Sequence, residues 1–176
     1  MPPPFFYSYE EFSHCTVAEF KDTLLKTSTK CVSRVTIFDL CSMSEYPNGL
    51  YFFYSTNPKV LQYVGKCTSR SFIERVPSHF DQRENAWFNT LPKKLAKQGI
   101  PYKQALSDAL KFNVVLLGIR QKEVSERLES VFRNTYRPIL NTPARPRPTA
   151  GDKTLVELVR DLTESSSGLP SAAAYA

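Results

Sequence analysis

The chain has 176 residues, of which 41% are hydrophobic and 23% are charged, and its formal net charge is +6. These values exclude a disordered chain and are typical of a globular protein that is long enough for one domain with a sizeable core. No apolar run approaches the roughly 20 residues that span a membrane. The N-terminus also lacks a basic region followed by an apolar one, so we expect an intracellular protein, cytoplasmic or nucleoid-associated, without a membrane partner.

The four cysteines, Cys15, Cys31, Cys41 and Cys67, include no CxxC pair, and the chain has only 2 histidines that might join them. A zinc site is therefore not expected, and reduced thiols are.

The charge is distributed unevenly along the chain. Residues 49–148 contain seventeen Lys/Arg and seven Asp/Glu, a net charge of +10, whereas residues 1–48 and 149–176 each have a net charge of −2. A basic domain with acidic flanks is typical of nucleic-acid binding. The alternative is a charge that serves solubility alone, because this signal is not specific.

Residues 1–48 are interpreted as an N-terminal extension packed on the core. Residues 1–12 are rich in proline and aromatic residues without a period, so we expect them to pack loosely or to remain mobile. The apolar spacing of Thr16–Thr27 predicts an amphipathic helix, and the run Val32–Leu40 suits a strand. Because so short a segment cannot build its own core, we expect this helix and strand to add to the edge of a central sheet.

Residues 49–65 predict a β-hairpin. Leu50–Ser55 is aromatic and β-rich, residues 56–59 have turn chemistry, and Val60–Val64 is strand-like again. Gly49 and Gly65 are expected at the outer ends of the two strands, where glycine permits positive φ or the close approach of a partner. Tyr51 and Tyr63 are expected side by side on neighbouring strands.

A short helix is predicted after the hairpin. Ser71 can cap a helix that begins at Phe72, and Arg75 and His79 would share one face because they lie four residues apart. Pro77 removes a backbone donor, so we expect this helix to end early or to kink.

Residues 81–90 are expected to form a loop, followed by a helix from Thr90 that ends before Gly99. Trp87 and Phe88 either stack on a base or anchor the core, and the core is favoured because large aromatic side chains dominate cores. The basic residues Lys93, Lys94 and Lys97 face either phosphate or solvent.

Two helices and a strand are predicted next. Pro101–Lys111 has a helical apolar stripe, Phe112–Leu117 suits a central strand covered on both faces, and Gln121–Tyr136 is an amphipathic helix with Glu129 on its flank. Pro138 then excludes further helix.

Residues 149–176 are expected to be a C-terminal helix and a disordered tail, separated from the domain by a linker at 144–148. The helix is predicted over Asp152–Thr163, and the tail over Ser165–Ala176. The apolar stripe of the helix needs a partner surface, either the core of the same chain or a second copy in a homodimer. Its members are Leu155, Leu158, Val159 and Leu162.

An ordered set of motifs resembles the GIY-YIG nuclease family over residues 49–141. It comprises GLY at 49–51, YVG at 63–65, Arg75, His79, Glu129 and Asn141. The resemblance implies an α/β domain of the α+β type at 49–148, with a small central mixed or antiparallel β-sheet flanked by helices. It also implies cleavage of DNA with a divalent cation, Mg²⁺ or Mn²⁺. Its catalytic set corresponds to Tyr51, Tyr63, Arg75 and Glu129 here, and Asn141 would fix the backbone after the helix.

The chemistry of these side chains suits phosphodiester hydrolysis. A lone carboxylate such as Glu129 suffices for Mg²⁺, which keeps several waters, and Arg75 has the fork that matches two phosphate oxygens. Tyr51 is a candidate general base, which would need help from Lys66 or His79 because a free phenol has a pKa near 10. The DNA-binding set that we predict is Lys66, Arg70, Lys93, Lys94 and Lys97.

The sequence leaves two functions open, a metal-dependent DNA endonuclease and an inactive DNA-binding or interaction module. The tyrosines might be ordinary cross-strand aromatics, and Glu129 might only pair with Arg133 four residues later. The DNA that is bound or cut, and a restriction, mobile-element or repair role, are also left open.

Overall fold

The computed structural model describes residues 4–42, 44–87, 90–142 and 152–167, with only the backbone described over 162–167. The protein is of the mixed α+β class, with a five-stranded mixed sheet that is open and flanked by helices. The strands are β1 (Phe6–Ser8), β2 (Lys30–Cys31), β3 (Asn48–Tyr54), β4 (Leu61–Cys67) and β5 (Asn113–Ile119). The expected fold class is therefore confirmed.

The sheet has the order β1-β5-β3-β4, and β2 also pairs with β5. The β1–β5 pair is parallel, and the other pairs are antiparallel. Every residue of β3 is buried, as is nearly all of β5, because these two strands lie in the middle of the sheet and are covered on both faces. The predicted hairpin β3–β4 and the predicted central strand β5 are both confirmed.

Eight α-helices are found among the described residues. They are α1 (Tyr9–Phe12), α2 (Val17–Lys26), α3 (Ile37–Cys41), α4 (Phe72–Ser78), α5 (Thr90–Ala96), α6 (Tyr102–Ala109), α7 (Lys122–Tyr136) and α8 (Leu155–Ser167). The predicted positions of α2, α4, α5, α6 and α7 are confirmed to within a few residues. No helix of the described ranges is long and apolar enough to cross a membrane.

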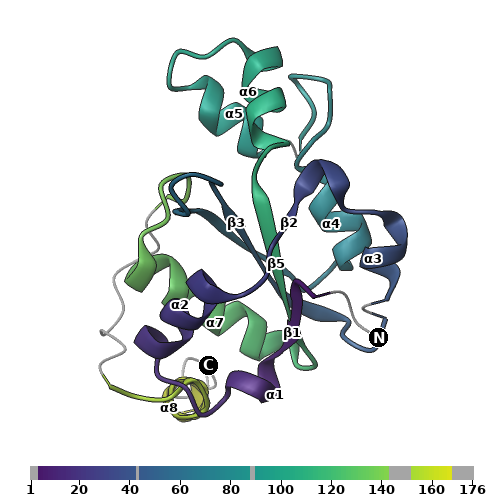
Figure 1. Ribbon diagram of the computed structural model, residues 1–176. Coiled ribbons are helices and arrows are strands. Elements are labelled where there is room, and N and C mark those ends of the chain that lie inside the picture. Colours follow the sequence, from purple (N-terminus) through teal and green to yellow (C-terminus); the bar gives the residue numbers. More distant parts are fainter. Residues whose placement is uncertain (1–3, 43, 88–89, 143–151, 168–176) are drawn as a thin grey trace, which may run out of the picture.

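Two apolar layers lie on opposite faces of the sheet (Figure 1). On the face that carries the side chains of Tyr51, Phe53 and Leu116, here the α4 face, helices α3, α4, α5 and α6 contribute to the core. On the face that carries Phe52 and Leu117, here the α7 face, helices α2, α7 and α8 do so. Figure 1 shows α5 and α6 together beyond one end of the strands.

The two glycines of the hairpin lie within the strands and not at their outer ends, which corrects the prediction. Their role is close approach. A Cβ on Gly65 would lie 2.2 Å from Cζ of Tyr51, and one on Gly49 would lie 2.4 Å from Cζ of Phe72 and 2.3 Å from the carbonyl oxygen of Leu117. Glycine at both positions therefore admits a ring from the α4 face against the backbone.

The predicted strand over Val32–Leu40 is wrong. Only Lys30–Cys31 is a strand there, followed by a 3₁₀ turn at Val32–Arg34 and by α3. The Asp39 carboxylate accepts hydrogen bonds from the backbone N–H of Thr36 at 2.7 Å and from the Lys30 ammonium at 2.6 Å. This capping box fixes a helix start that the β-branched composition hides.

Residues 4–12 are not loosely packed, contrary to the expectation for residues 1–12, of which 1–3 lie outside the described residues. Phe5 and Phe6 are buried, and the backbone N–H of Leu116 donates to the carbonyl oxygen of Phe5 at 2.9 Å, just before the parallel β1–β5 pairing. The extension thus contributes a strand to the sheet, although a different one from that predicted.

The C-terminal helix α8 packs on the same chain. Leu155 and Leu158 are buried in the core of the α7 face, and the backbone N–H of Leu155 donates to the carbonyl oxygen of Cys15 at 2.9 Å. These leucines therefore give no argument for a homodimer. The helix extends to Ser167, so the predicted disorder is wrong for 165–167, while the predicted linker at 144–148 and the rest of the tail lie outside the described residues.

Candidate functional site

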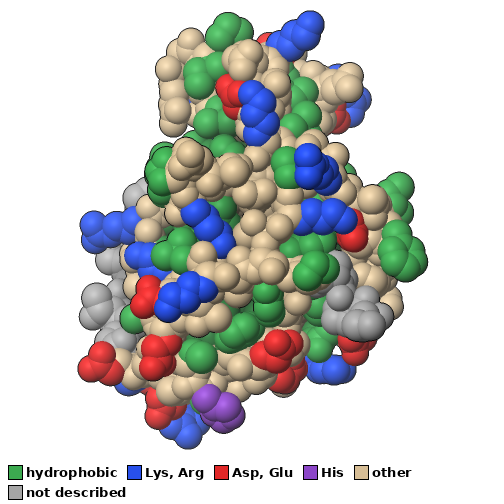
Figure 2. Space-filling model, in the orientation of Figure 1, with side chains coloured by type: hydrophobic (Ala, Val, Ile, Leu, Met, Phe, Trp, Pro, Cys, Tyr) green, Lys and Arg blue, Asp and Glu red, His purple; other side chains and the backbone are tan. Residues whose placement is uncertain are grey.

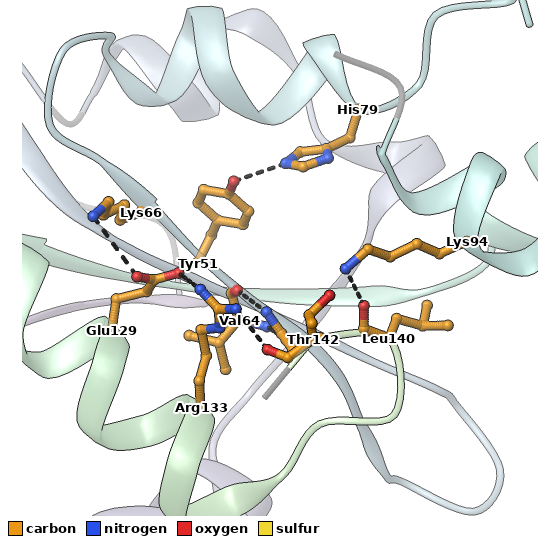
Figure 3. Close-up of polar contacts among 10 residues, drawn as sticks. Tyr51, Val64, Lys66, His79, Lys94, Glu129, Arg133, Leu140 and Thr142 are labelled. Atoms are coloured by element: carbon orange, nitrogen blue, oxygen red, sulfur yellow. Dashed lines mark hydrogen bonds and ion pairs between the residues drawn. The ribbon is translucent and has the colours of Figure 1, made fainter. Parts of the chain in front are cut away.

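The hydroxyl of Tyr51 and Nε2 of His79 are hydrogen-bonded at 2.7 Å (Figure 3). Tyr51 is in the central strand β3, and His79 is the residue that ends α4. Both side chains are 0% exposed. Pro77 lies in the last turn of α4 without ending it early, so Arg75 and His79 both belong to the α4 segment that covers this face.

Burial keeps this pair uncharged near neutral pH. It raises the pKa of Tyr51 well above the ordinary value, while the nearby Arg75 guanidinium acts in the opposite direction. Burial, together with the positive charges of Arg75 and Lys94, lowers the pKa of His79 to about 3. The hydrogen bond therefore joins a neutral phenol to a neutral imidazole, and the tautomer of His79 decides which of the two donates. Within the described residues no group is hydrogen-bonded to Nδ1 of that ring.

Tyr63 stacks beside Tyr51, as expected for neighbouring strands. Their ring centroids are 6.2 Å apart with an interplanar angle of 24°, and the register sets Tyr51 opposite Gly65 and Tyr63 opposite Phe53. Burial raises the pKa of Tyr63. The positive charges of Arg75 and Arg133 act to lower this pKa, and the negative charge of Glu129 acts to raise it. Tyr63 is therefore the side chain around which the predicted residues of α4 and α7 meet.

Glu129 of α7 reaches the outer edge of the sheet at β4. Its carboxylate lies 3.1 Å from the Arg133 guanidinium and 3.7 Å from the Lys66 ammonium, and its side chain is 12% exposed. Arg133 also donates to the carbonyl oxygen of Thr142 at 2.6 Å. Figure 3 shows this group in a row along the β4 edge, with Tyr51 and His79 on one side of it.

Asn141 holds the chain after α7 against the same edge. Its side-chain Oδ1 accepts from the backbone N–H of Val64 at 2.7 Å, and its Nδ2 donates to the carbonyl oxygen of Val64 at 2.9 Å. The preceding residue Leu140 donates its backbone N–H to the carbonyl oxygen of Gln62 at 2.8 Å. Asn141 therefore fixes the backbone that follows α7, next to Arg133 and Glu129.

The basic residues that we predicted to bind DNA have different environments. The ammonium of Lys94 turns inward, donates to the carbonyl oxygen of Leu140 and lies 5.3 Å from the Tyr63 ring centroid. Lys93 donates to the carbonyl oxygen of Ala86 at 2.9 Å, whereas Lys97 and Arg70 are exposed. On the face drawn in Figure 2, Lys and Arg side chains are scattered, and acidic ones gather mostly near α1 and α8.

A divalent cation at Glu129 fits under one condition. The described residues contain no group of three or more His, Cys, Asp and Glu side chains that could hold a metal ion. Mg²⁺, however, usually keeps several waters and takes one or two carboxylates together with substrate phosphate. The single partly exposed carboxylate of Glu129 suits such a site, provided that Lys66 and Arg133 give way to the cation.

Two contributions to this site were missed in the sequence. Arg133 was considered only as an ordinary helix-surface partner of Glu129, although its spacing of four residues carries the signal. The inward turn of Lys94 has no sequence signal, because it depends on where the segment after α7 returns to the sheet.

Comparison with protein-family models, with curated proteins and with solved structures found no match for this chain.

Proposed function

We propose that this protein is a divalent-metal-dependent endonuclease that hydrolyses phosphodiester bonds of DNA, with a site similar to that of the GIY-YIG family. The observation that carries the proposal is the convergence of Tyr51, Tyr63, Arg75, His79 and Glu129, which come from β3, β4, α4 and α7. Far apart in the sequence, they gather at one edge of the sheet. Action on DNA would also account for the excess of positive charge in residues 49–148, and it would associate the protein with the nucleoid.

The cations around Tyr63 suit a phosphate group. Arg75 acts electrostatically on Tyr51, Tyr63 and His79, and Arg133 acts on Tyr63. Lys94 lies over the Tyr63 ring. A phosphodiester at this edge would therefore meet several cations, of which Arg75 can bind two oxygens and stabilise the charge that develops during attack.

Glu129 is the residue that would hold the metal. When bound, the cation would neutralise phosphate charge and stabilise the negative charge that develops on the leaving oxygen. Lys66 and Arg133 would then exchange the carboxylate for phosphate oxygens, because a cation and two basic side chains compete for one Glu129.

The role of Tyr51 as a base requires local opening. Its hydroxyl is buried, and its raised pKa keeps it protonated near neutral pH. Access of water to this hydroxyl, with His79 accepting its proton, would be a step that precedes turnover.

The second candidate function is a DNA-binding or interaction module without turnover. The same two observations favour it, namely the ion-paired Glu129 and the buried Tyr51–His79 pair. Both functions predict DNA binding, and only the first predicts cleavage that depends on a cation.

The test is incubation of the protein with supercoiled, linear and branched DNA, with Mg²⁺, with Mn²⁺ or with EDTA. We expect cleavage that EDTA abolishes and that Glu129→Gln removes, while DNA affinity stays similar or rises because a negative charge near phosphate is lost. Glu126→Gln is the matched control, since Glu126 is exposed on the same helix. Tyr51→Phe should stop turnover and keep binding, whereas Arg75→Ala should reduce both. Cleavage by Glu129→Gln at the wild-type rate would refute a metal site at this residue.

A further inference from the structure

Trp87 is the only tryptophan of the chain, and its side chain is 85% exposed. The sequence favoured a core position for it, and this expectation is wrong; Phe88, beside it, lies outside the described residues. Large aromatic side chains normally bury most of their area. Most of the surface of this side chain is therefore accessible to solvent and to a ligand.

The loop that carries Trp87 joins two parts of the candidate site. Before the loop come His79 and Phe80, and the ring of Phe80 lies 5.7 Å from that of Phe53 on the α4 face. After the loop comes α5, in which Leu91 is buried and Lys94 reaches Tyr63. Trp87 is only four residues from Leu91 of α5, so the two Cα atoms lie within about 15 Å of each other by chain length alone.

The loop is held in place by hydrogen bonds on both sides. The Tyr102 hydroxyl donates to the carbonyl oxygen of Asp81 at 2.8 Å, and the Lys93 ammonium donates to the carbonyl oxygen of Ala86 at 2.9 Å. The Asp81 carboxylate also accepts from the Arg83 guanidinium at 2.6 Å and 3.0 Å. Trp87 thus directly follows an anchored residue, Ala86, at whose carbonyl oxygen the Lys93 ammonium lies, and Arg83 is four residues earlier in the chain.

An exposed indole close to cations has the chemistry of a stacking platform for nucleobases. The cations attract the phosphates, and the indole face stacks on a base whatever its identity. Bases within an intact duplex are already stacked on both sides and do not offer a face. We therefore propose that Trp87 stacks on an unpaired base of single-stranded or distorted DNA beside the candidate site. This inference rests on the proposed DNA-binding function and names its substrate class.

The single tryptophan makes the test direct, because all indole fluorescence of the protein reports Trp87. The wild-type chain is titrated in EDTA with a single-stranded oligonucleotide, with the matching duplex, and with the same duplex carrying one unpaired base. We expect strong quenching with the single strand and the bulged duplex and much weaker quenching with the intact duplex.

Affinity is measured separately by the anisotropy of labelled DNA. Trp87→Leu should weaken binding to the single strand and the bulged duplex about 10-fold or more, with little change for the duplex, and Trp87→Phe should keep part of the affinity. Phe38→Leu is the matched control, because Phe38 is 82% exposed on α3. This variant should bind all three DNAs as the wild type does.

Anisotropy that reports DNA binding while Trp87 fluorescence is unchanged would overturn this inference and leave the proposed function standing. Equal quenching by all three DNAs, or a Trp87→Leu variant with unchanged affinity, would do the same. Absence of any DNA binding by the wild type would overturn both proposals together.

Discussion

Gly65 is the position at which β4 leaves room for the ring of Tyr51. A Cβ there would lie 2.3 Å from the hydroxyl oxygen of Tyr51 and still closer to Cζ, and the ring cannot retreat because it is packed and hydrogen-bonded to His79. The glycine of the second motif therefore has a steric reason that is independent of catalysis. Any larger residue at position 65 would displace the Tyr51 ring from its position against β4.

We predict that Gly65→Ala lowers the free energy of unfolding by about 1–3 kcal/mol, the range for overpacked cores. Urea unfolding checks this. The matched comparison is the same substitution in a Tyr51→Ala background, where the ring is gone and the added methyl group has space. If Gly65→Ala lowers the free energy of unfolding equally in both backgrounds, the Tyr51 ring is not the reason that glycine is required at position 65.

His79 is predicted to make stability depend on pH. Its folded-state pKa, about 3, lies below the ordinary value, so the folded protein disfavours the charged imidazole. This contribution is fully present above about pH 6.5 and is lost as the pH falls from there towards 3, by about 1.4 kcal/mol per pH unit. Between pH 7 and pH 5 the wild type should lose about 2 kcal/mol more than His79→Gln does.

Unfolding by urea at a series of pH values measures this difference. The comparison with a variant is needed because carboxyl groups such as Asp39 and Asp81, whose pKa values are lowered in the folded protein, also reduce stability in acid. His14→Gln is the matched control, because His14 is exposed. The dependence of its unfolding free energy on pH should be the same as that of the wild type. Parallel profiles for the wild type and His79→Gln would contradict a buried neutral His79.

At the scale of the element, α8 acts as a cover for the α7 face. Leu155 is 0% exposed in that core, and the Arg127 guanidinium of α7 donates to the carbonyl oxygen of Val159 at 3.0 Å. We predict that Leu155→Ala costs about 2–5 kcal/mol of unfolding free energy. Val156→Ala, at a side chain that is 43% exposed on the same turn, should cost much less.

Thermal unfolding of both variants, together with a chain that ends at Pro148, measures the contribution of α8. The shortened chain should melt far below the wild type, since it lacks Leu155 and Leu158 and uncovers the core side chains that they contact. A shortened chain that melts like the wild type would mean that α8 is dispensable. Light scattering on the intact chain separately asks whether a second copy binds elsewhere.

The elements that the sequence predicted are those with strong local signals. The hairpin, α4 and α7 have apolar periods, turn residues and caps that agree with their packing. The segment after Val32 failed because its β-branched residues conflict with the Thr36–Asp39 capping box, and the local hydrogen bonds prevailed. The predictions for Trp87 and for the segment that forms β1 were wrong for another reason. The positions of both depend on partners distant in the sequence, which no local pattern encodes.

The sequence predicted which residues would lie near one another, whereas the function of these residues stays a prediction. The motif residues come together near the β4 edge, and the spacing of four residues indicated the Glu129–Arg133 pair. No local pattern indicated that the Tyr51–His79 pair is fully buried or that Lys66 also pairs with Glu129. Both features depend on burial and on side-chain directions. Glu129 was placed on the flank of α7 by its helical period, and that placement is why it reaches the sheet edge.

At the scale of the whole molecule, the positive charge of residues 49–148 divides into two kinds. Lys59 donates to the carbonyl oxygens of Leu24, Leu25 and Thr27 at the end of α2, so it serves the fold. Lys97 and Arg70 are exposed, so their charges face solvent, where they would act on phosphates at a distance. If the protein binds DNA as proposed, it should therefore neutralise fewer phosphates than the net charge of the segment suggests.

We predict that DNA affinity falls steeply with salt, and that Lys97→Glu and Arg70→Glu each reduce the slope by about one unit or more. Binding across a salt series measures the slope. Lys21→Glu is the matched control, because Lys21 is exposed on α2 outside the basic segment and should leave the slope unchanged. A flat salt response of the wild type would contradict an electrostatic footprint.

The hydrogen bonds between Asn141 and Val64 have a consequence for how the molecule behaves among its own copies. A bare strand at the rim of a sheet offers unpaired N–H and C=O groups to any other chain, and β4 is such a strand. The amide of Asn141 satisfies both groups of Val64, and Leu140 occupies the carbonyl of Gln62, so part of this rim is already paired within the chain. The segment that follows α7 thus also protects part of β4 from pairing with a strand of another molecule. Asn141 would therefore contribute to solubility even in a protein without catalytic activity.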